Sequence, residues 1–331
     1  MSEILIKSED VTSQDYGCAP DRRPIEELLR KGVVNLDKPR GPTSHQVASW
    51  IKDILGVKTG HGGTLDPAVS GCLPIFLGSA TRLSDLMLLS GKEYVCLMRL
   101  HAHATKKNIT SLLKKFQGNI YQRPPVKSSV KRVLRKRRVY ETELLEISDN
   151  NILFRISCEA GTYIRKYCHD FGLILGTEAH MQELRRIRSG VFTEDDTLVT
   201  LHDLKDAYVF WREGGEERFI RRCVLPMEYA VQNVPKLWVR DSAIDALCHG
   251  SDLAAPGVVR MEKFGKGKTV AVMSLKGELV ALGEALETTE SILRAKKGFV
   301  VRTDRVFMEP GTYPKRWKTQ SENTKDSRNG N

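Results

Sequence analysis

A glycine-rich stretch with a single acidic residue constrains this chain most. It reads Lys58-Thr-Gly-His-Gly-Gly-Thr-Leu-Asp-Pro-Ala-Val-Ser-Gly71, and five glycines fall among the sixteen residues from Gly56 to Gly71. Glycines permit tight backbone turns and close approach by a ligand. Asp66 precedes Pro67, and a residue before proline is driven toward an extended conformation. We therefore expect a loop that presents the Asp66 carboxylate, although a lone Asp-Pro pair is usually only a turn.

The residues before this loop predict a helix from Ser44 to Leu55. Apolar side chains recur at helical spacing, Thr43 or Ser44 can cap the start, and Gly56 provides a stop. The helix therefore leads directly into the glycine-rich loop.

Further along, hairpin signals outnumber repeated strand–helix–strand units. Residues 139–147 and 152–159 read as two strands joined by a turn at Asp149-Asn-Asn151. Two helices are predicted next, from Tyr163 to Leu175 and from Glu178 to Arg188. This mixture favours an α+β domain with a largely antiparallel sheet.

The length of 331 residues indicates two domains of ordinary size. Short strands separated by glycine turns between Leu237 and Met308 predict a small β-barrel. We expect an N-terminal arm over 1–30, a catalytic domain over 31–234, the barrel domain over 235–312 and a disordered tail over 313–331.

The charge points to a polyanionic partner. The chain has 52 basic and 41 acidic residues, a formal net charge of +11. Twelve residues, 127–138, hold seven bases and no acid: Lys127, Lys131, Arg132, Arg135, Lys136, Arg137 and Arg138. We interpret this run as an exposed loop that binds RNA phosphates in a salt-dependent manner. A merely solvated surface is the alternative.

Other classes receive little support from the sequence. No apolar run reaches the roughly 18 residues of a membrane helix, and the N-terminus does not read as a signal peptide, so we expect a cytosolic or nuclear protein without a membrane partner. The seven cysteines lack a Cys-x-x-Cys motif. His101 and His103 have no nearby carboxylates or thiols, so no metal site is predicted.

Three segments in order resemble one known family. The loop segment His61-Gly-Gly-Thr-Leu-Asp66-Pro, the upstream run from Asn35 to Ser44 and the downstream Gly161-Thr-Tyr-Ile-Arg165 resemble the TruB and dyskerin family of RNA pseudouridine synthases. The resemblance extends from about residue 32 to about residue 317. It implies a C-terminal PUA domain, which binds RNA, and a reaction that needs no cofactor.

The resemblance also implies roles for individual residues. Asp66 matches the nucleophile, Arg165 its ion-pair partner, and Tyr94 the tyrosine that stacks on the target base and takes part in proton transfer. The implied substrate pocket includes His61, Tyr163 and Leu184, and Lys38 joins the RNA-binding set. The bland alternatives are an ordinary strand aromatic for Tyr94, a core leucine on a helix for Leu184 and a buried structural histidine for His61.

The chemistry explains why a carboxylate and an arginine belong together. Burial would raise the pKa of Asp66 and hold it neutral, so a nearby guanidinium is needed to keep it charged. We predict that Asp66 and Arg165 lie within salt-bridge distance. The target uridine must also be flipped out of its stack, at a cost of a few kcal/mol.

Within the family, several phrases resemble the dyskerin branch, among them Lys92-Glu-Tyr-Val-Cys-Leu and Tyr121-Gln-Arg-Pro-Pro-Val. That branch acts on rRNA, and possibly tRNA, in box H/ACA ribonucleoproteins. The implied partners are a guide RNA, a target RNA, a Nop-type small protein, a Gar-type protein and a kink-turn-binding protein of the ribosomal family. The short tail suggests an archaeal-like, cytoplasmic protein; a eukaryotic one would be nucleolar. The alternatives are a stand-alone synthase for the tRNA T-loop and a non-catalytic RNA-binding scaffold.

Overall fold

The computed structural model describes residues 3–124 and 131–315. The chain divides into two compact units, which are described separately. Residues Ile25–Leu225 form the central unit, and Met1–Pro24 together with Pro226–Asn331 form the terminal unit. No helix in the described ranges is long and apolar enough to cross a membrane.

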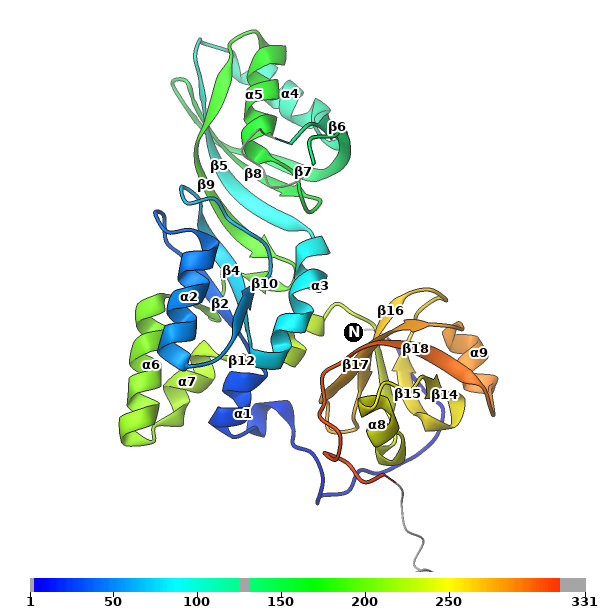
Figure 1. Ribbon diagram of the computed structural model, residues 1–331. Helices are drawn as coiled ribbons and strands as arrows, with labels where there is room; N and C mark the ends of the chain where they lie inside the picture. The colour runs from blue at the N-terminus through cyan, green and yellow to red at the C-terminus, as the bar shows by residue number, and fades with distance from the viewer. Residues whose placement is uncertain (1–2, 125–130, 316–331) are drawn as a thin grey trace, which may run out of the picture. The chain divides into compact units, whose positions relative to one another are not determined.

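A long mixed sheet runs through the central unit (Figure 1). Its main path is β11-β2-β4-β9-β5-β8-β7-β6, with β3 beside β4 and β10 beside β9. Along that path β11 pairs with β2, and β4 with β9, in parallel, and the other neighbours are antiparallel. The strands are β2 (Gly32–Lys38), β3 (Thr59–His61), β4 (Ser70–Leu77), β5 (Lys92–Leu100), β6 (Gly118–Gln122), β7 (Arg135–Ser148), β8 (Asn151–Cys158), β9 (Ala179–Ser189), β10 (Phe192–Thr193) and β11 (Leu198–Val199), with β12 (Leu225–Pro226) at the boundary of the units. The predicted α+β class with a largely antiparallel sheet is confirmed.

Helices cover this sheet and bury one continuous core. α4 and α5 lie on the strands β7 and β9, and α1 lies beside α7 (Figure 1). The helices are α1 (Ile25–Arg30), α2 (Ser44–Leu55), the 3-10 helix η2 (Gly78–Leu83), α3 (Ser84–Leu89), α4 (Lys106–Lys115), α5 (Ile164–Leu175), α6 (Leu201–Gly214) and α7 (Glu217–Cys223). α2 has the predicted bounds because Thr43 forms a capping box with Gln46 and Gly56 takes the left-handed conformation at its end.

The helix predicted from Glu178 to Arg188 is wrong, because this segment is the strand β9. β9 pairs with β5, and the register shifts between Leu97 and Met98, which face Glu183 and Met181. A β-bulge inserts a residue and breaks the two-residue alternation of a strand. Buried side chains consequently recur at irregular spacing, and that spacing imitates a helix.

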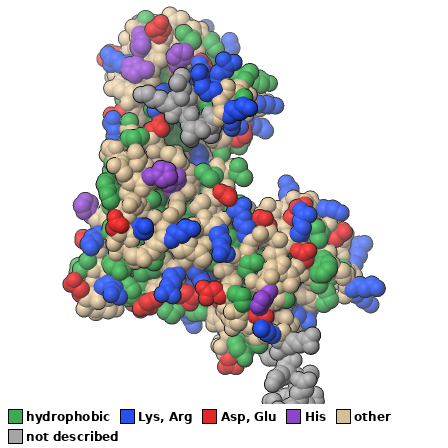
Figure 2. All heavy atoms as spheres, viewed as in Figure 1, with side chains coloured by type: hydrophobic (Ala, Val, Ile, Leu, Met, Phe, Trp, Pro, Cys, Tyr) green, Lys and Arg blue, Asp and Glu red, His purple; other side chains and the backbone are tan. Residues whose placement is uncertain are grey.

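The prediction that residues 127–138 form a loop is also partly wrong. Its second half, Arg135–Arg138, lies in β7 and pairs with β6. Lys131 and Arg132 precede the strand and are exposed, and Lys127 lies outside the described residues. Basic side chains gather at the end of the central unit that carries β6 and β7 (Figure 2).

The terminal unit contains a second sheet, of order β1-β15-β13-β16-β17-β18-β14, with its own apolar core. Its strands are β1 (Ile4–Ile6), β13 (Lys236–Val239), β14 (Leu253–Ala254), β15 (Val258–Glu262), β16 (Thr269–Met273), β17 (Leu279–Ala285) and β18 (Phe299–Val306). Its helices are α8 (Asp241–Cys248), α9 (Thr289–Arg294) and the 3-10 helices η1 (Pro20–Arg22), η3 (Met227–Val231) and η4 (Ala255–Gly257).

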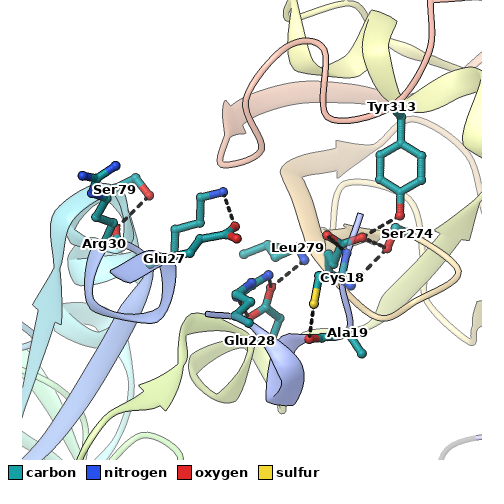
Figure 3. A network of polar contacts seen from close by, with 12 residues as sticks. Cys18, Ala19, Glu27, Arg30, Ser79, Glu228, Ser274, Leu279 and Tyr313 are labelled. Carbon is teal, nitrogen blue, oxygen red and sulfur yellow. Dashed lines mark hydrogen bonds and ion pairs between the residues drawn. The ribbon is translucent and has the colours of Figure 1, made fainter. Parts of the chain in front are cut away.

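The N-terminal segment is tied into the terminal unit by β1 and by a buried carboxylate. β1 pairs with β15. Glu278 accepts hydrogen bonds from the Cys18 amide, at 3.0 Å, and from the Tyr313 hydroxyl, at 2.6 Å (Figure 3). Tyr313 is buried. The disordered tail predicted to begin at residue 313 therefore does not include Tyr313, and residues 316–331 lie outside the described part.

Candidate active site

A cavity of about 550 Å³ opens in the central unit at the loop that carries Asp66. This volume falls within the range of small-molecule sites in proteins. Five segments contribute to its wall: the glycine-rich loop, α3, β5, β9, and the start of α5 with the residues just before it. The lining residues are Gly63, Thr64, Leu65, Asp66, Val69, Leu88, Lys92, Tyr94, Gly161, Thr162, Tyr163, Ile164, Arg165, Met181, Leu184 and Arg186.

Two buried side chains hold the Asp66 loop by its backbone. Ser44, in the first turn of α2, accepts from the Leu65 amide at 2.8 Å and donates to the Leu65 carbonyl at 2.9 Å. The ammonium of Lys38 donates to the Val69 carbonyl at 2.8 Å. The residues that flank Asp66 are thus fixed on both sides, which orients the carboxylate before any ligand arrives.

Arg165 forms the predicted ion pair with Asp66. Arg165 is the second residue of α5, and its Nη2 contacts Oδ2 of Asp66. The N-cap of this helix is Tyr163, whose amide and carbonyl bond the side chain of the buried Gln122 at 2.9 and 3.1 Å. Gln122 therefore fixes the helix start from which Arg165 reaches the carboxylate.

The environment of this pair differs from the expected one. The side chains of Arg165 and Asp66 are 54% and 56% exposed, so the expectation of a carboxylate buried in a low-dielectric site is wrong for the free chain. An exposed pair contributes only about 0–1 kcal/mol to stability. The pair therefore contributes little to stability, and its main effect is to hold a charged carboxylate and a guanidinium at the cavity.

Tyr94 projects from β5 into the same cavity. Burial raises the pKa of its hydroxyl. The guanidinium of Arg186, which lies opposite Tyr94 on β9, opposes this rise by its charge. Tyr94 is therefore a neutral phenol with a cation beside it.

Leu184 and His61 have different positions relative to the cavity. Leu184 lies on β9 and lines the cavity with Met181, so that an apolar surface faces the polar loop. His61 ends β3 and is not among the lining residues. Both of its ring nitrogens are buried without a hydrogen-bond partner in the described part of the chain. The centroids of the His61 and His45 rings lie 5.0 Å apart. Burial lowers the pKa of His61.

The expected RNA-binding residues separate into two groups. Lys38 is fully buried, and its contacts with Val69 and Pro39 carbonyls leave it no surface for a phosphate, contrary to the prediction. Lys136 and Arg138 are exposed on β7. Between them, Arg137 donates to the carbonyl of Gly161, a residue of the cavity rim, at 3.3 Å. The basic strand thus continues up to the cavity.

Four supporting residues were not predicted: Ser44 as a clamp on the loop, Gln122, Lys92 and Arg186. Gln122 lies in a segment that resembles the dyskerin branch and flanks the basic run, but neither feature assigns a contact to it. The helix predicted from Glu178 to Arg188 gives Arg186 no role, because only the pairing of β9 with β5 places it opposite Tyr94. For Ser44 the sequence signalled only a cap position, because its long-range contact depends on the folded loop.

Comparison with family models covers most of the chain. Residues 52–164 match the model of the TruB family pseudouridylate synthase N-terminal domain, and residues 165–232 match the tRNA pseudouridylate synthase B C-terminal domain. Residues 235–307 match the PUA domain, and residues 1–48 match the DKCLD (NUC011) domain.

Similar full-length proteins occur in archaea. A protein named probable tRNA pseudouridine synthase B from Methanothermobacter thermautotrophicus is 55% identical over 320 residues, 96% of this chain and 98% of that protein. A protein of the same name from Archaeoglobus fulgidus is 53% identical over 324 residues, 97% of this chain and 99% of that protein.

Solved structures agree with the fold over nearly the whole chain. The chain in a Cbf5-Nop10-Gar1 complex superposes with a TM-score of 0.90 at 52% identity, covering 95% of this chain and 96% of that one. A chain from an H/ACA RNP bound to a substrate RNA containing 2′-deoxyuridine gives 0.90 at 51% identity, covering 96% and 98%. A chain from the archaeal box H/ACA sRNP Nop10-Cbf5 complex gives 0.88 at 49% identity, covering 96% and 99%.

Proposed function

The chain belongs to the TruB family of pseudouridine synthases, and from this membership we propose that it isomerises guide-selected uridines, with Asp66 as nucleophile, in a box H/ACA ribonucleoprotein. The observation that carries the proposal is the meeting of Asp66, Arg165 and Tyr94 at one cavity, in a chain so similar to the chains of H/ACA complexes. The proposed substrate is rRNA, and possibly tRNA.

The isomerisation breaks the bond between ribose C1′ and N1 of uracil and joins C1′ to C5. The C5 proton leaves and N1 gains a proton, so the reaction needs neither an oxidant nor a reductant. A carboxylate can begin it by attack on C1′ or on C6 of the base. In the proposed mechanism Asp66 makes this attack, Arg165 holds the carboxylate charged and oriented, and Tyr94 stacks on the base and takes part in moving the C5 proton.

The uridine must leave its stack to reach Asp66. Leu184 and Met181 offer an apolar wall for the flipped ring, and Tyr163 lines the entrance beside Arg165. The exposure of Asp66 and Arg165 in the free chain fits a site that the RNA itself covers. Once covered, the pair would lie in a lower dielectric, where its charges act more strongly.

We further propose roles for the other parts of the chain. Residues 31–234 carry catalysis, and 235–312, which include the PUA match, bind RNA. Lys136, Arg138 and the neighbouring bases contact phosphates beside the cavity. Partner proteins of the Nop and Gar types are supported by the complexes that contain the similar chains. A kink-turn-binding protein and a cytoplasmic location complete the proposal.

The names of the archaeal relatives favour a second candidate, a synthase that modifies tRNA without a guide. One experiment separates the two. The full chain is mixed either with unmodified tRNA alone or with a guide RNA, its target and the partner proteins, and pseudouridine is measured in each RNA after nuclease digestion. Conversion only in the guided mixture supports the guided function. Conversion of naked tRNA at an equal rate contradicts it.

A non-catalytic scaffold is the third candidate, and it makes a different prediction. If the chain only binds RNA, Asp66→Asn leaves pseudouridine levels in cells unchanged. If Asp66 is the nucleophile, those levels fall at the target sites while the RNA and protein partners still assemble. Asp170→Asn is a matched control, since Asp170 also accepts from a basic residue of α5, Lys166, but does not line the cavity.

A further inference from the structure

A second arginine, Arg186, forms part of the cavity wall and is only 1% exposed. Its Nε donates to the Cys72 carbonyl at 2.8 Å, and its Nη2 donates to the Gly63 carbonyl at 3.0 Å. Both partners are neutral, and no ion pair joins Arg186 to a carboxylate within residues 3–124 and 131–315. A buried charge without a counterion is costly, which calls for a reason to keep it.

The charge of Arg186 acts on the groups of the cavity. Its charge opposes the rise that burial causes in the pKa of Tyr94, which lies opposite it on β5. A Cβ built on Gly63 would lie 3.6 Å from Nη1 of Arg186 and 3.6 Å from Cε of Lys92, so these two side chains border the same space. Burial together with the charge of Arg186 lowers the pKa of Lys92 to about 7. Whereas Asp66 and Arg165 balance each other, Arg186 leaves the inner wall positive.

We propose that Arg186 is an additional catalytic residue, which stabilises the negative charge that collects on the uracil ring during isomerisation. The inference rests on the proposed function and goes beyond the roles of Asp66, Arg165 and Tyr94.

The charge arises by either route. If Asp66 attacks C1′, the electron pair of the C1′–N1 bond leaves with the ring, and one negative charge spreads over N1, O2 and O4. If Asp66 adds to C6, the C5–C6 π electrons move into the C4 carbonyl, and the charge lies on O4. In the first route C5 then displaces the Asp66 carboxylate from C1′. In the second route the C1′–N1 bond breaks, C5 bonds C1′, and the Asp66 carboxylate leaves C6 as the C5–C6 double bond re-forms. In both routes the C5 proton leaves and N1 is protonated. A fixed, desolvated cation is suited to stabilise such a charge because it needs no reorganisation during the reaction.

A purely structural role is the competing explanation, since Arg186 also joins β9 to β4 and to the Asp66 loop through its carbonyl contacts. The two explanations differ in how they depend on the electronics of the base. A fluorine at C5 withdraws electrons and stabilises the ring anion, so the reaction should depend less on an external cation. A misplaced loop slows both bases by the same factor.

The test measures single-turnover loss of uridine and of 5-fluorouridine from otherwise identical target RNAs, using the full chain with guide RNA and partners. Arg186→Met should slow uridine conversion about 10²–10³-fold, as removal of an oxyanion-stabilising donor does. The loss for 5-fluorouridine should be at least about tenfold smaller. Arg188→Met is the matched control: Arg188 lies two residues along β9, contacts Glu93, and does not line the cavity. It should leave both rates unchanged.

Each outcome decides the proposal. Equal losses for the two bases, or no loss, overturn the role of Arg186 while leaving the proposed function intact. Absence of pseudouridine with the unaltered chain overturns both. If Arg186→Met does not fold, Arg186→Lys and Arg186→Gln carry the same comparison. Lysine, which keeps the charge, should retain more of the uridine rate than glutamine, and equal rates for the two variants contradict the inference.

Discussion

Removal of the Ser44 hydroxyl tests whether the Asp66 loop is held in place before RNA binds. Ser44 is buried, and its Oγ serves both the amide and the carbonyl of Leu65, the residue before Asp66. Ser44→Ala leaves two buried backbone groups without partners, and each costs about 1–3 kcal/mol. We expect the free energy of unfolding to fall by about 2–4 kcal/mol, since relaxation of the loop recovers part of the loss.

The same variant should slow the reaction. A misplacement of the reacting group by about 1 Å can cost about 10²-fold in rate, so we expect a loss of about 10–10²-fold in single-turnover conversion. Urea-induced unfolding gives the stability change. Ser79→Ala is the control, because the Ser79 hydroxyl makes one exposed contact of 3.4 Å with the Arg30 carbonyl and should change stability by less than about 0.5 kcal/mol. The reasoning is refuted if Ser44→Ala matches Ser79→Ala in both stability and rate.

Three further predictions follow from the structure. Gly71→Ala places a Cβ 2.3 Å from the Arg186 carbonyl oxygen of β9 at a φ of +101°, so the free energy of unfolding measured in urea should fall by more than about 2 kcal/mol. Gly56→Ala is the control: its Cβ meets open space at a φ of +69°, and the fall should be about 1 kcal/mol. Similar losses for the two variants would contradict the close packing at Gly71. Burial lowers the pKa of Lys92 to about 7 in the folded chain, whereas an unfolded lysine keeps its proton up to about pH 10. Between about pH 7 and pH 10 the unfolded state therefore binds more protons, and the free energy of unfolding rises with pH. Unfolding at about pH 7 and about pH 9.5 should show a smaller rise for Lys92→Met, and an unchanged rise would mean that Lys92 is not the group responsible. A double variant replaces two exposed bases of β7, as Lys136→Ala and Arg138→Ala. The plot of log affinity for RNA against log salt concentration should become less steep by about one to two. An unchanged slope would mean that these two bases do not contact RNA phosphates.

The sequence predicted those parts of the site that depend on local chemistry. The helix from Ser44 to Leu55 has a capping residue, an apolar face and a terminal glycine within one segment, and its bounds are confirmed. The Asp66–Arg165 contact was predicted from family resemblance and from the need of a carboxylate for a cation, and the structure has that ion pair.

The parts that failed depend on pairing between distant segments. The segment of β9 lacks the alternation typical of a strand because a bulge against β5 disturbs it, and this bulge arises only when the two strands pair. The RNA-binding role expected for Lys38 fails because the folded loop supplies carbonyls that satisfy its ammonium in the core, a rare place for a lysine. The burial expected for Asp66 came from the chemistry of the reacting complex, whereas the free chain exposes the carboxylate.

The most direct test of the central claim is tritium release from a target RNA labelled at C5 of the uridine, because the C5 proton must leave when C5 bonds C1′. The full chain is assayed with guide RNA and partners, in its unaltered form and as Asp66→Asn. We predict stoichiometric release by the unaltered chain and none above background by the variant, with RNA binding preserved in both. Release by Asp66→Asn at the unaltered rate would contradict the account.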